Sequence, residues 1–289
     1  MANGNTPNPG VQRRRLRAEL RRARQQAELT QEQVAGAMDW SLSKVIRIEA
    51  GSVGISTNDL KALLRLYKIF DEEQTVDLIA LARVGRERSW QSAYRDVVSA
   101  RLLQLIETEG DASIIRTFEP LLVPGLLQTE EYARAVLGQF AAPTTPERID
   151  AQVEVRMRRQ ELLDRDDPPL MFFILDEAVT RRMVGSAAVM RRQVRRLVEL
   201  AGRPHVTIEI VPFSAGVHPG LQGPFVIYEF PDPADDDVLF LENPLGDVIS
   251  RDSPEEILRY RVAFEQLRKL SLGRDGSQAY LDDLAKEMG

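Results

Sequence analysis

The stretch LTQEQVAGAMDWSLSKVIRIEAG (29–51) decides the fold of the N-terminal part of the chain. Thr30 is followed three residues later by Gln33, which is the spacing of a capping box at a helix start. Ser41 is placed to cap a second short helix. A turn of about four residues around Asp39 separates the two helices, which is helix-turn-helix spacing. The stretch therefore predicts two short helices, of which the second is the recognition helix.

The predicted second helix has a buried and an outward side. Val45 and Ile48 occupy the buried side, which leaves Ser43, Lys44 and Arg47 on or near the opposite one. Arg47 has the reach and the two-pronged donor set that match guanine O6 and N7. Ser43 can donate or accept a hydrogen bond, and Lys44, a flexible point charge, is better suited to phosphate. A short helix with these side chains fits the major groove of B-DNA.

These residues resemble the Xre type of helix-turn-helix, the class shared with phage repressors. The resemblance implies that Gln31 and Lys44 bind phosphate, while Leu42, Ser43 and Arg47 face bases, with Leu42 against a thymine methyl. The position of Gln31 alone also favours this role, because backbone N–H groups at a helix start can hold phosphate. The predicted DNA-binding residues are Gln31, Ser41, Leu42, Ser43, Lys44 and Arg47.

Two residues depart from the Xre pattern, and one is expected to be structural. Asp39 stands at a turn position where Gly is usual, but Asp tolerates the left-handed backbone that the turn needs. Ile46 stands where close relatives often have Ser, which bears on the base preferred there. The resemblance implies a structural role for Glu49.

Charge is distributed unevenly along the chain. Residues 11–68 contain 12 Lys and Arg against 6 Asp and Glu, whereas residues 69–289 contain 26 against 38. A basic N-terminal unit on an acidic body favours a polyanion partner for the first unit only. The alternatives are a solvated basic helix and a helix-turn-helix lookalike that does not bind DNA. The local positive charge and the five-helix context favour DNA binding over these alternatives.

Composition excludes several classes of site. The 289 residues include no Cys and only two His, His205 and His218, which excludes disulfides, thiolate catalysis, cysteine-ligated metals and multi-histidine metal sites. We therefore expect no metal and no cofactor. No apolar run approaches about 18 residues, so no membrane span is expected. The first ten residues lack the features of a secretory signal. These observations favour a cytoplasmic protein, nucleoid-associated when it is bound to DNA.

The pattern predicts a multidomain protein. An all-α helix-turn-helix domain and a helical linker are followed by an α/β (or α+β) C-terminal domain, because the character of the chain changes at Pro168. A helix at about 186–201 separates the first two predicted strands, and the later strands cluster. The predicted strands are 170–175, 206–213, 224–230 and 237–242. The predicted regions are a disordered tail (1–10), the helix-turn-helix domain (11–70), a helical connector (71–110) and a regulatory domain (111–289).

Three long segments of the C-terminal part resemble a domain of unknown function from actinobacterial regulators. They are FEPLLVPGLLQTEEYARAVL (118–137), DDPPLMFFILDEAV (166–179) and VTIEIVPFSAGVHPGLQGPFVIYEF (206–230). This domain follows an Xre-type helix-turn-helix in the WhiJ-like, antitoxin-like transcriptional regulators. The resemblance implies a regulator that is often encoded beside a small partner protein, and it implies no known ligand.

Three residues of the C-terminal part are candidates for chemistry. Asp176 and Glu177 follow a strand, where carboxylates can be catalytic or bind a ligand, and His218 lies in a Gly/Pro-rich loop. The structural alternatives are that Glu177 caps the next turn and that His218 belongs to a structural loop. No G-x-S-x-G elbow, Walker loop or dinucleotide motif accompanies them. We therefore expect no catalytic residue and treat the three as candidates for ligand or partner binding.

The function that the sequence favours is a sequence-specific regulator of double-stranded DNA. Its C-terminal domain would sense a small molecule or a small protein partner. A homodimer is expected, because one helix-turn-helix reads few base pairs and paired half-sites about 34 Å apart raise specificity. One alternative is an antitoxin-like protein that sequesters a neighbour and autoregulates. The other is an enzyme with an accessory DNA-binding module, which would need Asp176, Glu177 and His218 to converge in a pocket.

Overall fold

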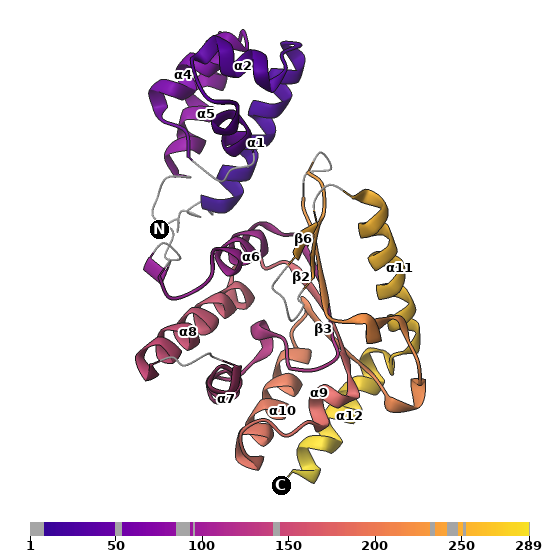
Figure 1. Ribbon diagram of the computed structural model, residues 1–289. Coiled ribbons are helices and arrows are strands. Elements are labelled where there is room, and N and C mark those ends of the chain that lie inside the picture. Colours follow the sequence, from indigo (N-terminus) through magenta and orange to yellow (C-terminus); the bar gives the residue numbers. More distant parts are fainter. Residues whose placement is uncertain are drawn as a thin grey trace, which may run out of the picture. The chain divides into compact units, whose positions relative to one another are not determined.

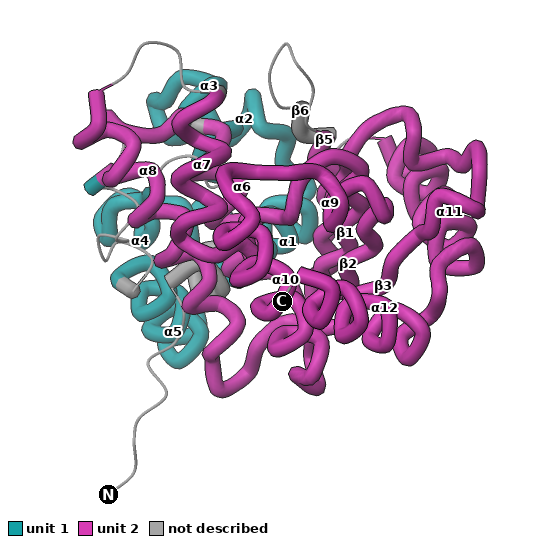
Figure 2. The backbone as a smooth tube through the Cα atoms, turned by 90° about the horizontal axis from the view of Figure 1, so that it is seen from below, with its two compact units in different colours: residues 1–93 teal, residues 94–289 magenta. Residues whose placement is uncertain are grey.

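The computed structural model describes residues 9–49, 54–84, 93–94, 96–140, 145–231, 235–241, 248–250 and 253–288. The chain divides between Ala93 and Tyr94 into two compact units (Figures 1 and 2). Most of the predicted tail, residues 1–8, lies outside the described residues.

The described part of the first unit is helical. Its helices are α1 (Pro9–Gln26), α2 (Gln31–Met38), α3 (Leu42–Glu49), α4 (Thr57–Leu66) and α5 (Glu72–Val84) (Figure 2). They enclose one apolar core, to which α2 contributes Val34, α3 contributes Val45 and Ile48, and α4 contributes Leu60 and Leu64. These residues recur at helical spacing, so each helix turns one apolar face inward.

The local signals of the helix-turn-helix are present in the structure. Thr30 and Gln33 form the predicted capping box at the start of α2. Asp39 ends α2 in the left-handed region, with φ 53° and ψ 46°. The Ser41 hydroxyl accepts a hydrogen bond from the Lys44 N–H at 3.2 Å and so caps α3. The predictions for these three local features are confirmed.

Residues 71–110, predicted as a helical connector, contribute to both units. Helix α5 packs against α1 and places Leu78 and Leu81 in the core of the first unit. Helix α6 (Ala100–Asp111) places Leu105 in the main core of the second unit. Each helix has an apolar face, and each face is buried in a different core.

The second unit is built on a six-stranded sheet among the described residues. The strands are β1 (Ile114–Glu119), β2 (Leu170–Asp176), β3 (Val206–Val211), β4 (Phe225–Glu229), β5 (Val238–Leu241) and β6 (Val248–Ser250). Their order is β3-β2-β1-β4-β5-β6. The pairs β1–β2 and β2–β3 are parallel and the other pairs are antiparallel. Helices separate the parallel strands in the sequence, as parallel pairing requires. The predicted fold class is confirmed.

Strands β1 and β6 were not among the predicted strands. Strand β1 is central in the sheet, between β2 and β4. Its apolar run is short and contains Arg116, which hides the strand pattern. In the fold, Arg116 Nε lies 2.6 Å from Glu229 Oε1 on the neighbouring strand, and this ion pair accommodates the charge within the sheet.

Helices cover both faces of the sheet (Figure 1). On one face, α11 contributes Phe264 and Leu267 to a cluster that includes Phe118 and Phe225. On the other face, a larger cluster includes residues of α6, α7, α10 and α12. The α-helices that follow α6 in the second unit are α7 (Glu130–Phe140), α8 (Pro146–Arg159), α9 (Glu177–Arg181), α10 (Ala187–Ala201), α11 (Pro254–Leu270) and α12 (Gly273–Glu287). The 3-10 helices are η2 (Gly125–Leu127), η3 (Gln160–Asp164), η4 (Phe213–Ala215) and η5 (Pro219–Gln222).

Buried amide side chains hold the irregular segment between β1 and α7. Gln193 of α10 donates to the Leu127 carbonyl at 2.8 Å and accepts from the Thr129 N–H at 2.8 Å. Gln160 of η3 donates to the carbonyls of Gly125 and Gln128 at 3.0 and 2.7 Å. These bonds replace the backbone pairing that an irregular segment lacks, so the segment can be buried without unsatisfied polar groups.

Candidate nucleic-acid interface

A buried carboxylate joins the three helices behind the candidate interface. Glu49, at the end of α3, is only 4% exposed. Its carboxylate oxygens lie 2.7 Å from Arg24 Nε and 3.2 Å from Arg24 Nη2 of α1. Gln31 Nε2 of α2 donates to Glu49 Oε2 at 2.8 Å. The hydrogen bond from Arg24 to Glu49 raises the pKa of Arg24. The structural role that the sequence implied for Glu49 fits this geometry.

The outward side of α3 carries the residues expected to face DNA bases. Val45 and Ile48 are buried, whereas Ser43 and Arg47 are exposed. Arg47 Nε donates to the Ser43 carbonyl at 3.1 Å, which directs the guanidinium along the outward side of the helix. The predicted division of α3 into a buried and an outward side is therefore present.

Two large apolar side chains lie on the same exposed part of α3. Leu42 is 37% exposed and Ile46, one helical turn later, is 44% exposed. Positions four residues apart are neighbours on a helix surface. The outward side thus presents an apolar pair beside the polar pair of Ser43 and Arg47. Ser41, just before the helix, is exposed as well.

Lys44 is held against its own domain. Its Nζ lies 3.2 Å from Asp59 Oδ2 of α4 and 3.8 Å from the centre of the Trp40 ring. The ammonium group can contact phosphate only by competing with these two partners. Both side chains of the ion pair remain about one third exposed, so solvent screens the pair and keeps it weak.

Gln31 is partly committed to the Glu49 cluster. Its amide nitrogen donates to Glu49, so only the second hydrogen of that amide remains for a phosphate. The backbone N–H of Gln31 is the first of α2 and has no carbonyl of its own helix to bond. The contribution of Gln31 to phosphate binding would therefore come mainly from its backbone.

In the second unit, Asp176 and His218 come together, and Glu177 has a different partner. Asp176 Oδ2 lies 3.2 Å from His218 Nε2, and Asp176 Oδ1 accepts from the Ala178 N–H at 2.8 Å to cap α9. Glu177 Oε2 accepts from the Phe213 N–H at 2.9 Å. Glu177 therefore holds the segment after β3, a role that neither the functional nor the capping prediction described.

The Asp176–His218 pair is closed off from solvent. Asp176 and His218 are both buried, and the His218 ring packs edge-on against Phe118 with their centres 5.9 Å apart. His218 Nδ1 is buried and has no hydrogen-bond partner among the described residues. The pair thus anchors the loop between β3 and β4 to the end of β2.

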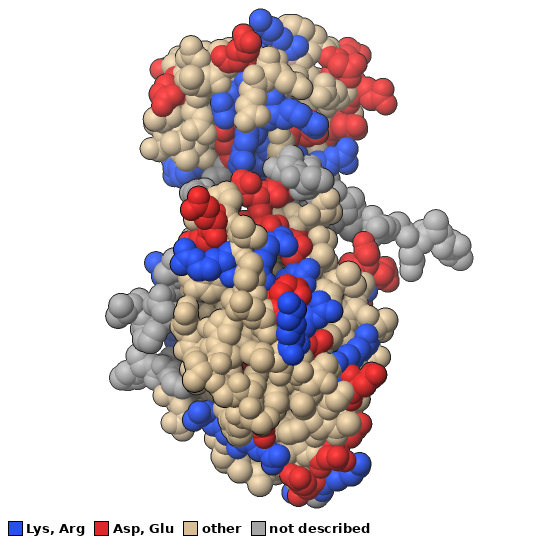
Figure 3. Space-filling model, turned by 90° about the vertical axis from the view of Figure 1, so that its right-hand side faces the viewer, with Lys and Arg blue, Asp and Glu red and all other residues tan. Residues whose placement is uncertain are grey.

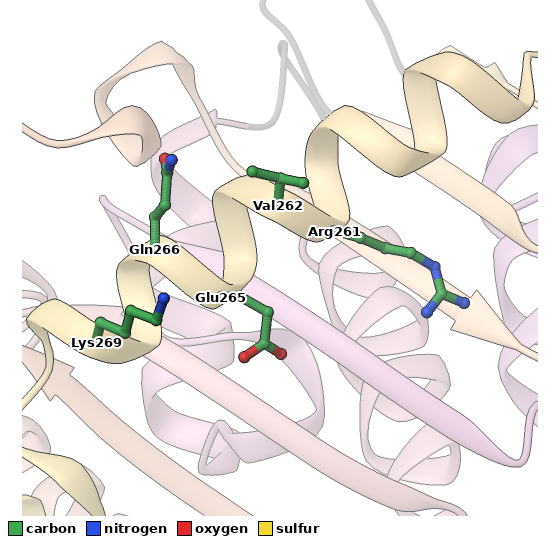
Figure 4. Close-up of a pocket in the computed structure, with 5 residues that line it drawn as sticks. All are labelled: Arg261, Val262, Glu265, Gln266 and Lys269. Carbon is green, nitrogen blue, oxygen red and sulfur yellow. The ribbon is translucent and has the colours of Figure 1, made fainter.

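A surface hollow of the second unit lies elsewhere. It runs along α11 and is lined by Arg261, Val262, Glu265, Gln266 and Lys269 (Figure 4). None of the three predicted ligand-binding residues lines it. Among the described residues, no group of three or more His, Asp or Glu side chains is placed to hold a metal ion. No helix in the described part of the chain is both long and apolar enough to cross a bilayer.

Comparison with known families defines the class of both units. The family model of a helix-turn-helix domain matches residues 15–78, which supports a DNA-binding regulator. The model of a domain of unknown function, DUF5753, matches residues 102–283, well over half of the chain. The chain therefore belongs to the DUF5753 family and carries a helix-turn-helix domain before the family's domain. No curated protein and no solved structure matches it.

Proposed function

We propose that this chain is a sequence-specific transcriptional regulator of the WhiJ-like, antitoxin-like Xre type, which inserts α3 into the major groove of double-stranded DNA. The observation that carries the proposal is the division of α3. Val45 and Ile48 anchor the helix in the core, while Ser43 and Arg47 are exposed and linked by a 3.1 Å hydrogen bond. Helix α3 lies within residues 15–78, which the helix-turn-helix family model matches, and this supports a role for its outward side in DNA binding.

Each outward residue has a distinct role in this proposal. Arg47 reads guanine through two parallel hydrogen bonds, and Ser43 bonds a neighbouring base edge. Leu42 contacts a thymine methyl group. Ser41 and the backbone of Gln31 bind phosphates at the starts of α3 and α2, where N–H groups are unpaired.

Lys44 contributes to DNA affinity by exchanging the carboxylate of Asp59 for a DNA phosphate. In the free protein its ammonium group is paired with Asp59. On DNA, a phosphate replaces Asp59, because the weak, screened pair costs little to break. The binding free energy that Lys44 contributes is therefore smaller than that of an exposed lysine without an ion-pair partner.

For the second unit, we propose a regulatory role in a cytoplasmic, nucleoid-associated homodimer. Its domain senses a small molecule or a small protein encoded nearby. Asp176, Glu177 and His218 take part by fixing the loop between β3 and β4, since their bonds run to that loop or to the start of α9. The same bonds disfavour an enzyme, because Asp176 and His218 are buried and Glu177 is held by a backbone amide.

Selection of binding sites from a pool of random duplexes tests the proposal. The purified full chain should enrich one sequence with two related half-sites whose centres are about 10 base pairs or a multiple of that apart. The Arg47→Ala variant should enrich a pool that is relaxed at one base in each half-site. A pool that stays random after repeated rounds would overturn the proposal. Co-purification of a neighbouring gene product, with no enriched duplex, would favour the sequestering alternative.

A further inference from the structure

The segment from Ile210 to Tyr228 is the longest part of the chain without Asp, Glu, Lys or Arg. It contains the end of β3, the loop with η4 and η5, and most of β4. Residues 69–289 as a whole are strongly acidic, with 26 Lys and Arg against 38 Asp and Glu. The absence of charged side chains from this segment therefore contrasts with the acidic composition of the surrounding domain.

The loop is rigidly attached on its inner side. His218 forms a hydrogen bond with Asp176, and the Phe213 N–H donates a hydrogen bond to Glu177. Gly220 is buried, and a Cβ atom there would lie 2.3 Å from the Phe118 ring, so the backbone packs directly on that ring. Three separate contacts therefore fix the loop to the end of the sheet.

The outer side of the loop is apolar. Phe213 is 60% exposed, Val217 is 92% exposed and Leu221 is 60% exposed. We refer to Phe213, Val217 and Leu221 as the apolar ridge. Summed over the three side chains, the exposed area is on the order of 350 Å², within the range of the largest apolar patch on a typical monomer, which is often a functional surface. Fixing such side chains on a rigid loop reduces the entropy that a partner must overcome.

Helix α11 extends this surface. It packs against η5 and carries Leu258 and Val262, both at least half exposed and one turn apart, with charged side chains such as Arg259 and Glu265 around them. Figure 3, which faces the α11 side of the molecule, shows a broad area of the second unit without charged side chains. A stable dimer needs roughly 800 Å² from each partner, so the apolar ridge would supply nearly half of the area, while Leu258, Val262 and the polar rim around them would supply the remainder.

We propose that the apolar ridge is the surface through which a second copy of this chain binds. Two acidic units repel each other where charged faces meet, and an uncharged surface is where two copies can touch without that cost. A basic partner would instead prefer the acidic faces. A small apolar ligand would need a cavity, whereas the three side chains of the ridge are mostly exposed to solvent. The inference rests on the proposed function only for the use of the dimer, which is to present two copies of α3.

The mass of the full chain in solution without DNA tests the proposal. The wild type should be a dimer at micromolar concentration. Val217→Glu, at a fully accessible position, should raise the dimer dissociation constant tenfold or more and leave the melting temperature of the monomer unchanged. Leu170→Glu, which adds the same charge at an exposed position at the start of β2, should leave the dimer intact. A monomeric wild type, or a Val217→Glu variant that dimerises normally, would overturn the proposal.

Cross-linking gives a second readout that does not depend on a destabilising change. The chain has no Cys, so single-cysteine variants have one reactive site. A bifunctional maleimide should join Val217→Cys into covalent dimers and leave Leu170→Cys monomeric. Equal yields from both variants would contradict the assigned surface. Because neither assay uses DNA, failure of the dimer and failure of DNA binding are seen separately.

Discussion

In the first unit, the buried carboxylate of Glu49 lies behind the outward residues of α3, whereas in the second unit Asp176, a residue predicted to bind a ligand or partner, is itself buried. Glu49 binds Arg24 and Gln31 and leaves Ser43 and Arg47 exposed. Asp176 binds His218 and caps α9. The comparison shows that the burial of a charged residue, more than its type, decides whether its side chain stabilises the fold or is available to contact a ligand.

Loss of Glu49 should produce the largest effect. Glu49→Ala leaves the partly buried guanidinium of Arg24 without its carboxylate partner, so the free energy of unfolding of the first unit should fall by about 3 kcal/mol. Trp40 packs against the core of the first unit, so urea denaturation followed by the fluorescence of Trp40 reports on that unit. Glu19→Ala, which removes an exposed surface pair with Arg22, is the matched control and should change stability by less than about 1 kcal/mol. Equal losses in both variants would contradict the assignment.

Loss of the Asp176 side chain should destabilise the second unit and leave the affinity for DNA unchanged. Asp176→Ala removes a helix cap and leaves His218 unpaired, so we expect a loss of about 2–3 kcal/mol, measured by calorimetry. Affinity for the specific duplex should stay within twofold. Asp283→Ala, which removes a solvent-exposed pair with Lys286, is the control. A variant of unchanged stability that no longer responds to an effector would restore Asp176 as a contact residue.

Loss of Arg47 should affect specific DNA far more than random DNA. Arg47→Ala should cost about 1–3 kcal/mol on the selected duplex, because a bidentate contact to guanine is lost. Titrations of the same variant with a random duplex should show a much smaller change. Stability should be unchanged, since the side chain is exposed. The same loss on both duplexes would show that Arg47 contributes only charge.

Loss of Lys44 should give the smallest effect. Lys44→Ala should weaken all duplexes slightly and lower the slope of log affinity against log salt by about 0.9, one phosphate contact. Asp59→Asn should strengthen binding by up to about fivefold on all duplexes, because it removes a competing pair worth about 0.2–1 kcal/mol. A salt slope that Lys44→Ala leaves unchanged would remove Lys44 from the phosphate contacts.

Much of the fold could be predicted because its signals are local. The capping box of Thr30, the left-handed Asp39 and the cap at Ser41 each depend on residues within a few positions, and all three are present. The helical and strand periods of the C-terminal part likewise gave the fold class. Strand β1 escaped prediction because Arg116 interrupts it, and the partner of that charge, Glu229, lies 113 residues away.

The sites could be predicted less well because their partners are distant in sequence. The outward direction of Ser43 and Arg47 follows from helical spacing alone. The pairing of Lys44 with Asp59 and the bond from Glu177 to the Phe213 amide depend on how elements pack. Phe213, Val217 and Leu221 in an uncharged segment are visible in the sequence, but only the structure shows that all three are exposed.

Protection of α3 by DNA tests the central claim most directly. Because the chain has no Cys, Ser43→Cys provides a single reactive thiol on the outward side of the helix. The selected duplex should slow maleimide labelling of Ser43→Cys at least tenfold, while labelling of Gln74→Cys, exposed on α5, stays constant. Labelling of Ser43→Cys that proceeds equally fast with and without saturating duplex would contradict the account.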